Sequence, residues 1–183
     1  MLRITVPGQE FYDEKKNEFV QTKPTVLQLE HSLVSISKWE SKWHKPFLTM
    51  DEKAGERTQE QSQDYIRCMT INQDVDPMAY KAITRDQMQQ INDYINDPMT
   101  ATWFNEKENK KSREVMTSEL IYYSMTALNI PFECQKWHIN RVLTLIRVCS
   151  IKSQPPKKMS RRDAAMQRRS LNASRRARMG SKG

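Results

Sequence analysis

Residues 25–43 read TVLQLEHSLVSISKWESKW, and the spacing of their apolar residues changes midway. In the first six residues apolar and polar side chains alternate, which places Leu27 and Leu29 on one face of a β-strand. From Ser32 onward the apolar residues recur every three or four positions, the spacing of one helix face. The segment therefore predicts a strand that leads directly into a helix. This helix ends before Pro46, because a residue that precedes proline avoids helical backbone angles.

The residues before this segment predict a small β-sheet. LRITV (2–6) is rich in β-branched residues and ends at a Pro-Gly turn signal. Two short apolar pieces, Phe11-Tyr12 and Phe19-Val20, flank a charged centre and suggest a hairpin. With residues 25–30 as a further strand, we expect an N-terminal antiparallel sheet of two or three strands over residues 1–30.

The residues after this segment predict a mostly helical region over 32–151. Helices are expected around Tyr65, after Asp76-Pro77, after the capping-box pair Thr84 and Gln87, over 119–128 and over 134–148. The expected fold class is therefore α+β and mostly α-helical, with the small sheet packed on the helices.

The positive charge of the chain is concentrated at its end. The 183 residues carry a net charge of +8, yet residues 152–183 hold eleven of the thirty basic residues and one of the twenty-two acidic ones. Such asymmetry is typical of an interaction arm. The expected organisation is a folded domain over 1–151, a hinge over 152–159 that contains Pro155-Pro156, and a basic arm over 160–183. The arm is expected to be helical, with Ser160 as N-cap, or disordered.

The basic arm is the first candidate binding region. Its candidate residues are Lys157, Lys158, Arg161, Arg162, Arg168, Arg169, Arg175, Arg176 and Arg178. Three interpretations are open: contact with the phosphates of a nucleic acid, docking on an acidic protein, or a solvated tail with no partner. Because the apolar side of the arm is thin, we also expect the protein to form homo-oligomers.

Aromatic residues give two further candidates for partner binding. Trp39 and Trp43 lie one helical turn apart among lysines, so they suit base stacking or an interface anchor, or simple packing in the core. Trp103 and Phe104 precede a polar loop and form either a plug in the core or an exposed docking patch.

No pattern in the sequence indicates an enzyme. GxSxG, GxxxxGK[ST] and GxGxxG are all missing, and the chain has only four glycines. Cys134 and His138 are four residues apart, which on one helix face gives at most two of the four ligands that zinc requires. Packing of a thiol and an imidazole at the edge of the core is the other interpretation. We therefore expect no enzymatic activity, no cofactor and no metal.

The compartment follows from features that the sequence lacks. The three cysteines are odd in number and form no CxxC pair, which favours a reducing compartment. The first residues contain no apolar core of a signal peptide, and no apolar run approaches the ~20 residues of a membrane helix. A cytosolic protein that does not contact a membrane is expected.

Five long segments, which together cover most of the chain, carry a family resemblance. They are LQLEHSLVSISKWESKWHKPFL (27–48), DYIRCMTI (64–71), INDYINDPMTATWF (91–104), SREVMTSELIYYSMTALNIPFECQKWHINRVLTLIRVCSIK (112–152) and PPKKMSRRDAAMQRRSLNASRRA (155–177). These segments resemble small proteins encoded by tailed bacteriophages, the tail assembly chaperones of long-tailed phages.

The resemblance implies a function and a partner. Such chaperones bind the long, helical, aggregation-prone tape measure protein during tail morphogenesis, before the tail tube forms around it. They act in the cytoplasm of the host cell and are generally absent from the finished virion. The resemblance implies no catalytic residue. The alternatives are a minor tail protein that stays in the virion and a nucleic-acid-binding protein that acts through the basic arm.

Overall fold

The computed structural model describes residues 1–13, 17–48, 57–104, 115–154 and 160–180. The chain divides into two compact units, residues 1–150 and residues 151–183. The first unit contains a small β-structure and most of the helices, and the second contains the C-terminal helix. The fold is α+β and mostly helical, as the sequence predicts.

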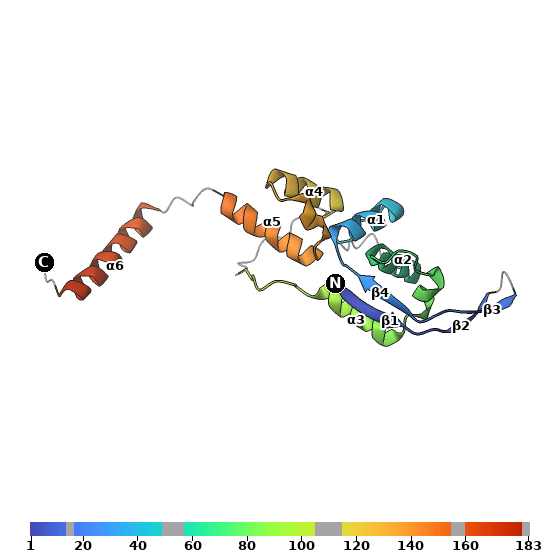
Figure 1. Ribbon diagram of the computed structural model, residues 1–183. Helices are drawn as coiled ribbons and strands as arrows, with labels where there is room; N and C mark the ends of the chain where they lie inside the picture. The colour runs from blue at the N-terminus through green and yellow to red at the C-terminus, as the bar shows by residue number, and fades with distance from the viewer. Residues whose placement is uncertain (14–16, 49–56, 105–114, 155–159, 181–183) are drawn as a thin grey trace. The chain divides into compact units, whose positions relative to one another are not determined.

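The elements follow one another in an order close to the expected one (Figure 1). They are β1 (Leu2–Val6), β2 (Glu10–Asp13), β3 (Glu18–Gln21), β4 (Thr25–Leu29), α1 (Leu33–Trp43), α2 (Gln59–Met69), the 3₁₀ helix η1 (Pro77–Ala82), α3 (Arg85–Asn96), α4 (Ser118–Ala127), the 3₁₀ helix η2 (Phe132–Lys136), α5 (Ile139–Ser153) and α6 (Arg161–Met179). Because α5 continues to Ser153, the first two residues of the expected hinge are helical. Residues 155–159 lie outside the described residues.

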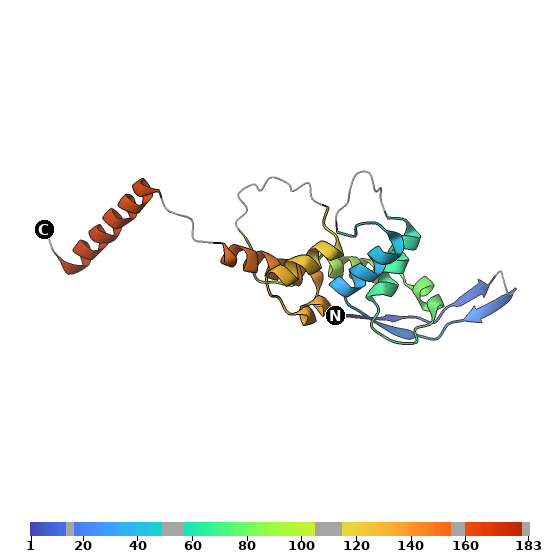
Figure 2. The same cartoon turned by 90° about the horizontal axis from the view of Figure 1, so that it is seen from above.

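The four strands form two consecutive antiparallel ladders, β1 with β4 and β2 with β3. The two ladders meet where the amide of Thr22 donates to the carbonyl of Gln9 at 2.8 Å. Gly8 allows this close approach, since a Cβ there would lie 2.5 Å from the carbonyl oxygen of Thr22. The strands thus form one long ribbon, and β2–β3 extends it away from the helices of the first unit (Figure 2).

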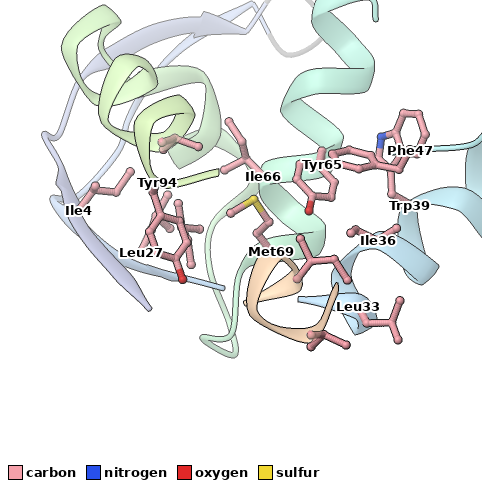
Figure 3. Packing of buried hydrophobic residues seen from close by; sticks show 14 of the residues in the cluster. Ile4, Leu27, Leu33, Ile36, Trp39, Phe47, Tyr65, Ile66, Met69 and Tyr94 are labelled. Atoms are coloured by element: carbon pink, nitrogen blue, oxygen red, sulfur yellow. The ribbon is translucent and has the colours of Figure 1, made fainter. Parts of the chain in front are cut away.

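The core of the first unit lies between the β1–β4 ladder and the helices. Leu27 and Leu29 are fully buried, whereas Val26 on the opposite face is 47% exposed, as the alternating pattern predicts. The inward side chains of β4 continue into those of α1, and they meet Tyr65, Ile66 and Met69 of α2 (Figure 3). In the first unit α2 contacts β4 and α3 contacts β1, so both helices pack against the ladder.

The capping signals mark the helix starts correctly. Thr84 and Gln87 form the reciprocal capping box at the start of α3, and Asp76 caps η1 at the amide of Met78. The side chain of Ser160 accepts a hydrogen bond from the amide of Asp163 at 3.1 Å, which starts α6 where the sequence predicts.

The helix predicted over 134–148 is wrong in its first part. Residues 132–136 form the short helix η2, and a regular helix begins only at Ile139. Between them, His138 forms a β-bridge with Ser32, and the amide of Ile139 donates to the carbonyl of His31 at 2.7 Å. These tertiary hydrogen bonds use backbone groups that a continuous helix needs for itself, so the helix is interrupted.

Within the described residues, no helix combines the length and the apolar character that a membrane span requires.

The contrast between Leu27 and Val26 predicts a difference in stability. Leu27→Ala removes a fully buried side chain from the meeting point of β4, α2 and α3, so we expect a loss of roughly 2–5 kcal/mol in the free energy of unfolding, measured by urea denaturation. Val26→Ala, on the exposed face of the same strand, is the matched control and should cost less than about 1 kcal/mol. Equal losses for both variants would contradict the assignment of the buried face.

Candidate partner-binding surfaces

Trp39 and Trp43 lie where α1 packs against α2. The Trp39 indole is 1% exposed, and its Nε1 donates to the carbonyl of Gln61 at 3.0 Å. Trp43 is half-buried, and its Nε1 donates to Oδ2 of Asp64 at 2.9 Å. Trp39 therefore belongs to the core, and its interpretation as an accessible anchor or base-stacking residue is wrong. A tryptophan at this helical spacing is buried because it is the largest apolar group that α1 can supply to the core.

Asp64 is the acid that joins α1 to α2. It is 6% exposed and forms an ion pair with Lys42 in addition to its hydrogen bond from Trp43. Burial alone would raise the pKa of Asp64, but the hydrogen bonds from Lys42 and Trp43, with the charge of Lys42, lower the pKa below its ordinary value. Lys42 and Trp43 therefore have a structural role that the sequence does not reveal, since their partner lies more than twenty positions away.

Glu40 is a second buried acid with a structural role. Its two carboxylate oxygens accept the backbone amides of Phe47 at 2.7 Å and of Ser118 at 2.8 Å. Ser118 is the first residue of α4, so Glu40 binds the start of one helix from the middle of another. No local signal in the sequence indicates the contact of Glu40 with a residue 78 positions away.

Two buried histidines, His31 after β4 and His138 before α5, lie against each other. The rings of His31 and His138 are 5.0 Å apart in an edge-on arrangement. The Nδ1 of His31 is hydrogen-bonded to the hydroxyl of Tyr65, and Nε2 of His138 donates to the carbonyl of Tyr94 at 3.0 Å. Burial, followed by the charges of His138 and Arg57, lowers the pKa of His31 to about 3. Burial also lowers the pKa of His138, although its hydrogen bond to Tyr94 acts in the opposite direction.

Cys134 and His138 do not have the helical arrangement expected for two ligands of one metal ion. Cys134 lies in η2 and His138 lies beyond its end, so the two do not share a face of one helix. Across the residues that the structure describes, no group of three or more His, Cys, Asp or Glu side chains is arranged to hold a metal ion. Both residues are buried, which agrees with packing at the edge of the core.

Trp103 and Phe104 separate in the structure. Phe104 is partly buried, and the guanidinium of Arg147 lies 4.1 Å from the centre of its ring. Both line a surface pocket of about 390 Å³ between the residues after α3 and helix α5. Trp103 is 81% exposed, so the prediction that it plugs the core is wrong, and the docking-patch interpretation remains a proposal. Phe104 contacts Arg147 of α5, whereas Trp103 is largely exposed.

The β2–β3 ladder carries an aromatic pair that sequence reasoning did not select. Tyr12 and Phe19 are directly opposed, with ring centres 5.2 Å apart, and they are 51% and 71% exposed. Cross-strand aromatic pairs of this kind stabilise isolated ladders. The hairpin predicted from the two apolar pieces was the available signal, because opposed residues of a hairpin lie on the same face.

The basic candidates of the arm lie on helix α6. Every residue from 161 to 179 is exposed except Ala164, which is partly exposed, and none is buried. The seven arginines of α6 are Arg161, Arg162, Arg168, Arg169, Arg175, Arg176 and Arg178, and Asp163 is its only acid. Both ion pairs of the described residues, Met1–Glu30 and Lys42–Asp64, lie elsewhere. Lys157 and Lys158 lie outside the described residues.

Comparison of the chain with models of protein families, with curated proteins and with solved structures found no match.

The two buried histidines predict how stability depends on pH. The folded state holds His31 neutral far below the ordinary histidine pKa of about 6.5, whereas the unfolded chain binds protons there, so stability is present at neutral pH and is lost as pH falls. Between about pH 7 and pH 4.5, His31 should account for a loss of roughly 2–3 kcal/mol in the free energy of unfolding.

The measurement is urea unfolding of the wild type and of His31→Gln at a series of pH values. The variant should be less stable at neutral pH but show a flatter pH dependence. His44→Asn, at an exposed position with φ of 51°, is the matched control and should keep the slope of the wild type. An unchanged slope in His31→Gln would contradict the prediction.

Proposed function

We propose that this protein is a non-enzymatic chaperone of bacteriophage tail assembly, which binds the tape measure protein in the cytoplasm of the host cell. Two considerations support the proposal. The five quoted segments resemble the tail assembly chaperones of long-tailed phages, and the chain presents a helix suited to binding a polypeptide.

The observation that carries the proposal is the exposure of α6. A helix of 19 residues with no buried side chain gains little stability from packing, because most helical stability in proteins comes from burying one face. Its exposed Met166, Leu171 and Met179 provide apolar contacts, and its arginines provide charge. Such a helix is typical of a segment that acquires its packing from a partner.

The first unit supports the same function in a different way. The aromatic side chains of Trp39, Phe47 and Tyr65 are buried in the core of this unit. Glu40, Asp64 and His31 form contacts that hold its elements together. Exposed aromatic side chains that this unit offers to a partner include the Tyr12–Phe19 pair of the ribbon, Trp103, Tyr123 and Phe132. These are scattered contacts of the kind that an elongated client can bridge.

The test is co-expression with the tape measure protein of the same phage. We expect the soluble fraction of the client, measured by centrifugation and gel densitometry, to rise several-fold when the chaperone is present, because its binding covers apolar surface that otherwise aggregates. The matched control is Leu27→Ala at a temperature where that variant is largely unfolded. If the client precipitates equally with and without the wild-type chain, the proposal is wrong.

A second measurement separates this function from that of a structural tail protein. Mass spectrometry of purified virions should detect the tape measure protein but not this chain. Stoichiometric amounts in the virion would favour the minor tail protein instead.

A further inference from the structure

The arginines of α6 are arranged in pairs with a fixed repeat. The pairs are Arg161-Arg162, Arg168-Arg169 and Arg175-Arg176, so each pair follows the previous one after seven residues. Seven residues are nearly two turns of an α-helix, and each pair is therefore displaced by only about 20° around the axis and about 10.5 Å along it. The six guanidinium groups form a stripe along one face of the helix. We call this stripe the arginine face.

Apolar residues border the arginine face on both sides. Ala164 and Leu171 follow one border, also seven residues apart, and Met166 and Ala173 follow the other. Leu171 is 51% exposed and Met166 is 63% exposed. The opposite side of the helix carries small or polar residues, among them Ser170 and Ser174. One side of α6 thus combines periodic charge with apolar margins.

The charge of this face is not balanced within α6. Asp163 is the only acid among its residues, and its carboxylate accepts a hydrogen bond from the hydroxyl of Ser160 at 2.6 Å at the helix start. The arginine pairs place like charges along one face of α6, and like charges repel one another. An anionic partner that follows the stripe removes this repulsion and stabilises the helix.

The seven-residue repeat selects the kind of anion. Two α-helices that lie side by side stay in register when both repeat every seven residues, and charged residues beside the contact then pair along its length. Arginine suits this role because its planar guanidinium binds a carboxylate through two parallel hydrogen bonds. A nucleic-acid backbone requires a high density of positive charge but no such repeat, and it offers nothing to the apolar margins.

We infer that the arginine face binds an α-helix of the client that carries carboxylate side chains every seven residues, with apolar residues beside them. This inference rests on the proposed function for the identity of the client, and it adds the chemistry and the register of recognition. The exposed apolar margins contact the partner's apolar residues, and the paired arginines fix the two helices along their length.

The test uses full-length protein and two synthetic helical peptides of about twenty residues. The first peptide carries pairs of glutamates every seven residues beside leucines. The second has the same composition, with the glutamate pairs distributed around the helix. We expect the wild-type protein to bind the first peptide at least about fivefold more tightly than the second in fluorescence anisotropy, because exposed ion pairs contribute little individually and must add up in register.

The matched variant rearranges α6 without changing its composition or charge. Arg168→Ser, Arg169→Leu, Ser170→Arg and Leu171→Arg together move the middle arginine pair by two positions, which rotates it by about 200° around the helix. This variant should bind the first peptide about fivefold more weakly than the wild type and should bind the second peptide equally well. Circular dichroism checks that its helix content is unchanged.

Four results would overturn the inference. Equal binding of the two peptides would show that binding depends on charge density alone. Full binding of the first peptide by the rearranged variant would show the same. A DNA oligonucleotide that binds more tightly than the first peptide, and equally to both proteins, would assign the face to nucleic acid. Self-association that the rearrangement abolishes and the first peptide does not displace would assign it to a second copy of the chain.

These results are separable from those on the proposed function. If the rearranged variant keeps the tape measure protein as soluble as the wild type does, the arginine face is not its binding site and the chaperone function stands. If the wild type discriminates between the peptides but leaves the client insoluble, the recognition stands and the chaperone function is wrong.

Discussion

The backbone of residues 28–31 holds the first unit together. This short stretch pairs with β1, with the residues at the end of α2 and with the first residue of α5. The hydrogen bonds join Glu30 to Met69, Gln28 to Ile71 and His31 to Ile139 at 2.9, 2.9 and 2.7 Å. Buried backbone groups must be paired, so this junction fixes where α2 ends and α5 begins. Leu29 within this stretch and Leu33 just after it are fully buried in the core.

Local signals were sufficient for the parts of the fold that depend on local physics. The change from a period of two to a period of three or four around residues 25–43 gave both β4 and α1, and the capping boxes gave the starts of helices. The sequence could not indicate the break before Ile139, because it arises from pairing with a segment more than a hundred positions away. Propensity alone favours continuing the helix there, and tertiary hydrogen bonds prevail over a preference worth a few tenths of a kcal/mol per residue.

The candidate surfaces show the same division between local and long-range information. The arginines of α6 could be selected as candidates from sequence because their density and spacing can be read directly from the residues. Trp39 could not be assigned, since an apolar stripe at helical spacing is equally consistent with a core and with an interface until its neighbours are known. The hydrogen bond from Trp39 to Gln61 shows that the indole lies in the core, and that contact joins two helices across a loop. Glu40 and Asp64 were missed for the same reason.

The distribution of apolar and charged residues bears on how the protein would bind the client of the proposed function. The first unit buries several large aromatic residues, among them Trp39, Phe47 and Tyr65, in its own core, where a partner cannot use them as anchors. The arginine face instead offers exposed ion pairs, each worth at most about 1 kcal/mol and weakened by salt. In the proposed function, strong retention of a long client would then require many such contacts, supplied by several copies of the chain along the client helix. Each copy would remain individually weak, so that it could be displaced when the tail tube forms around the client.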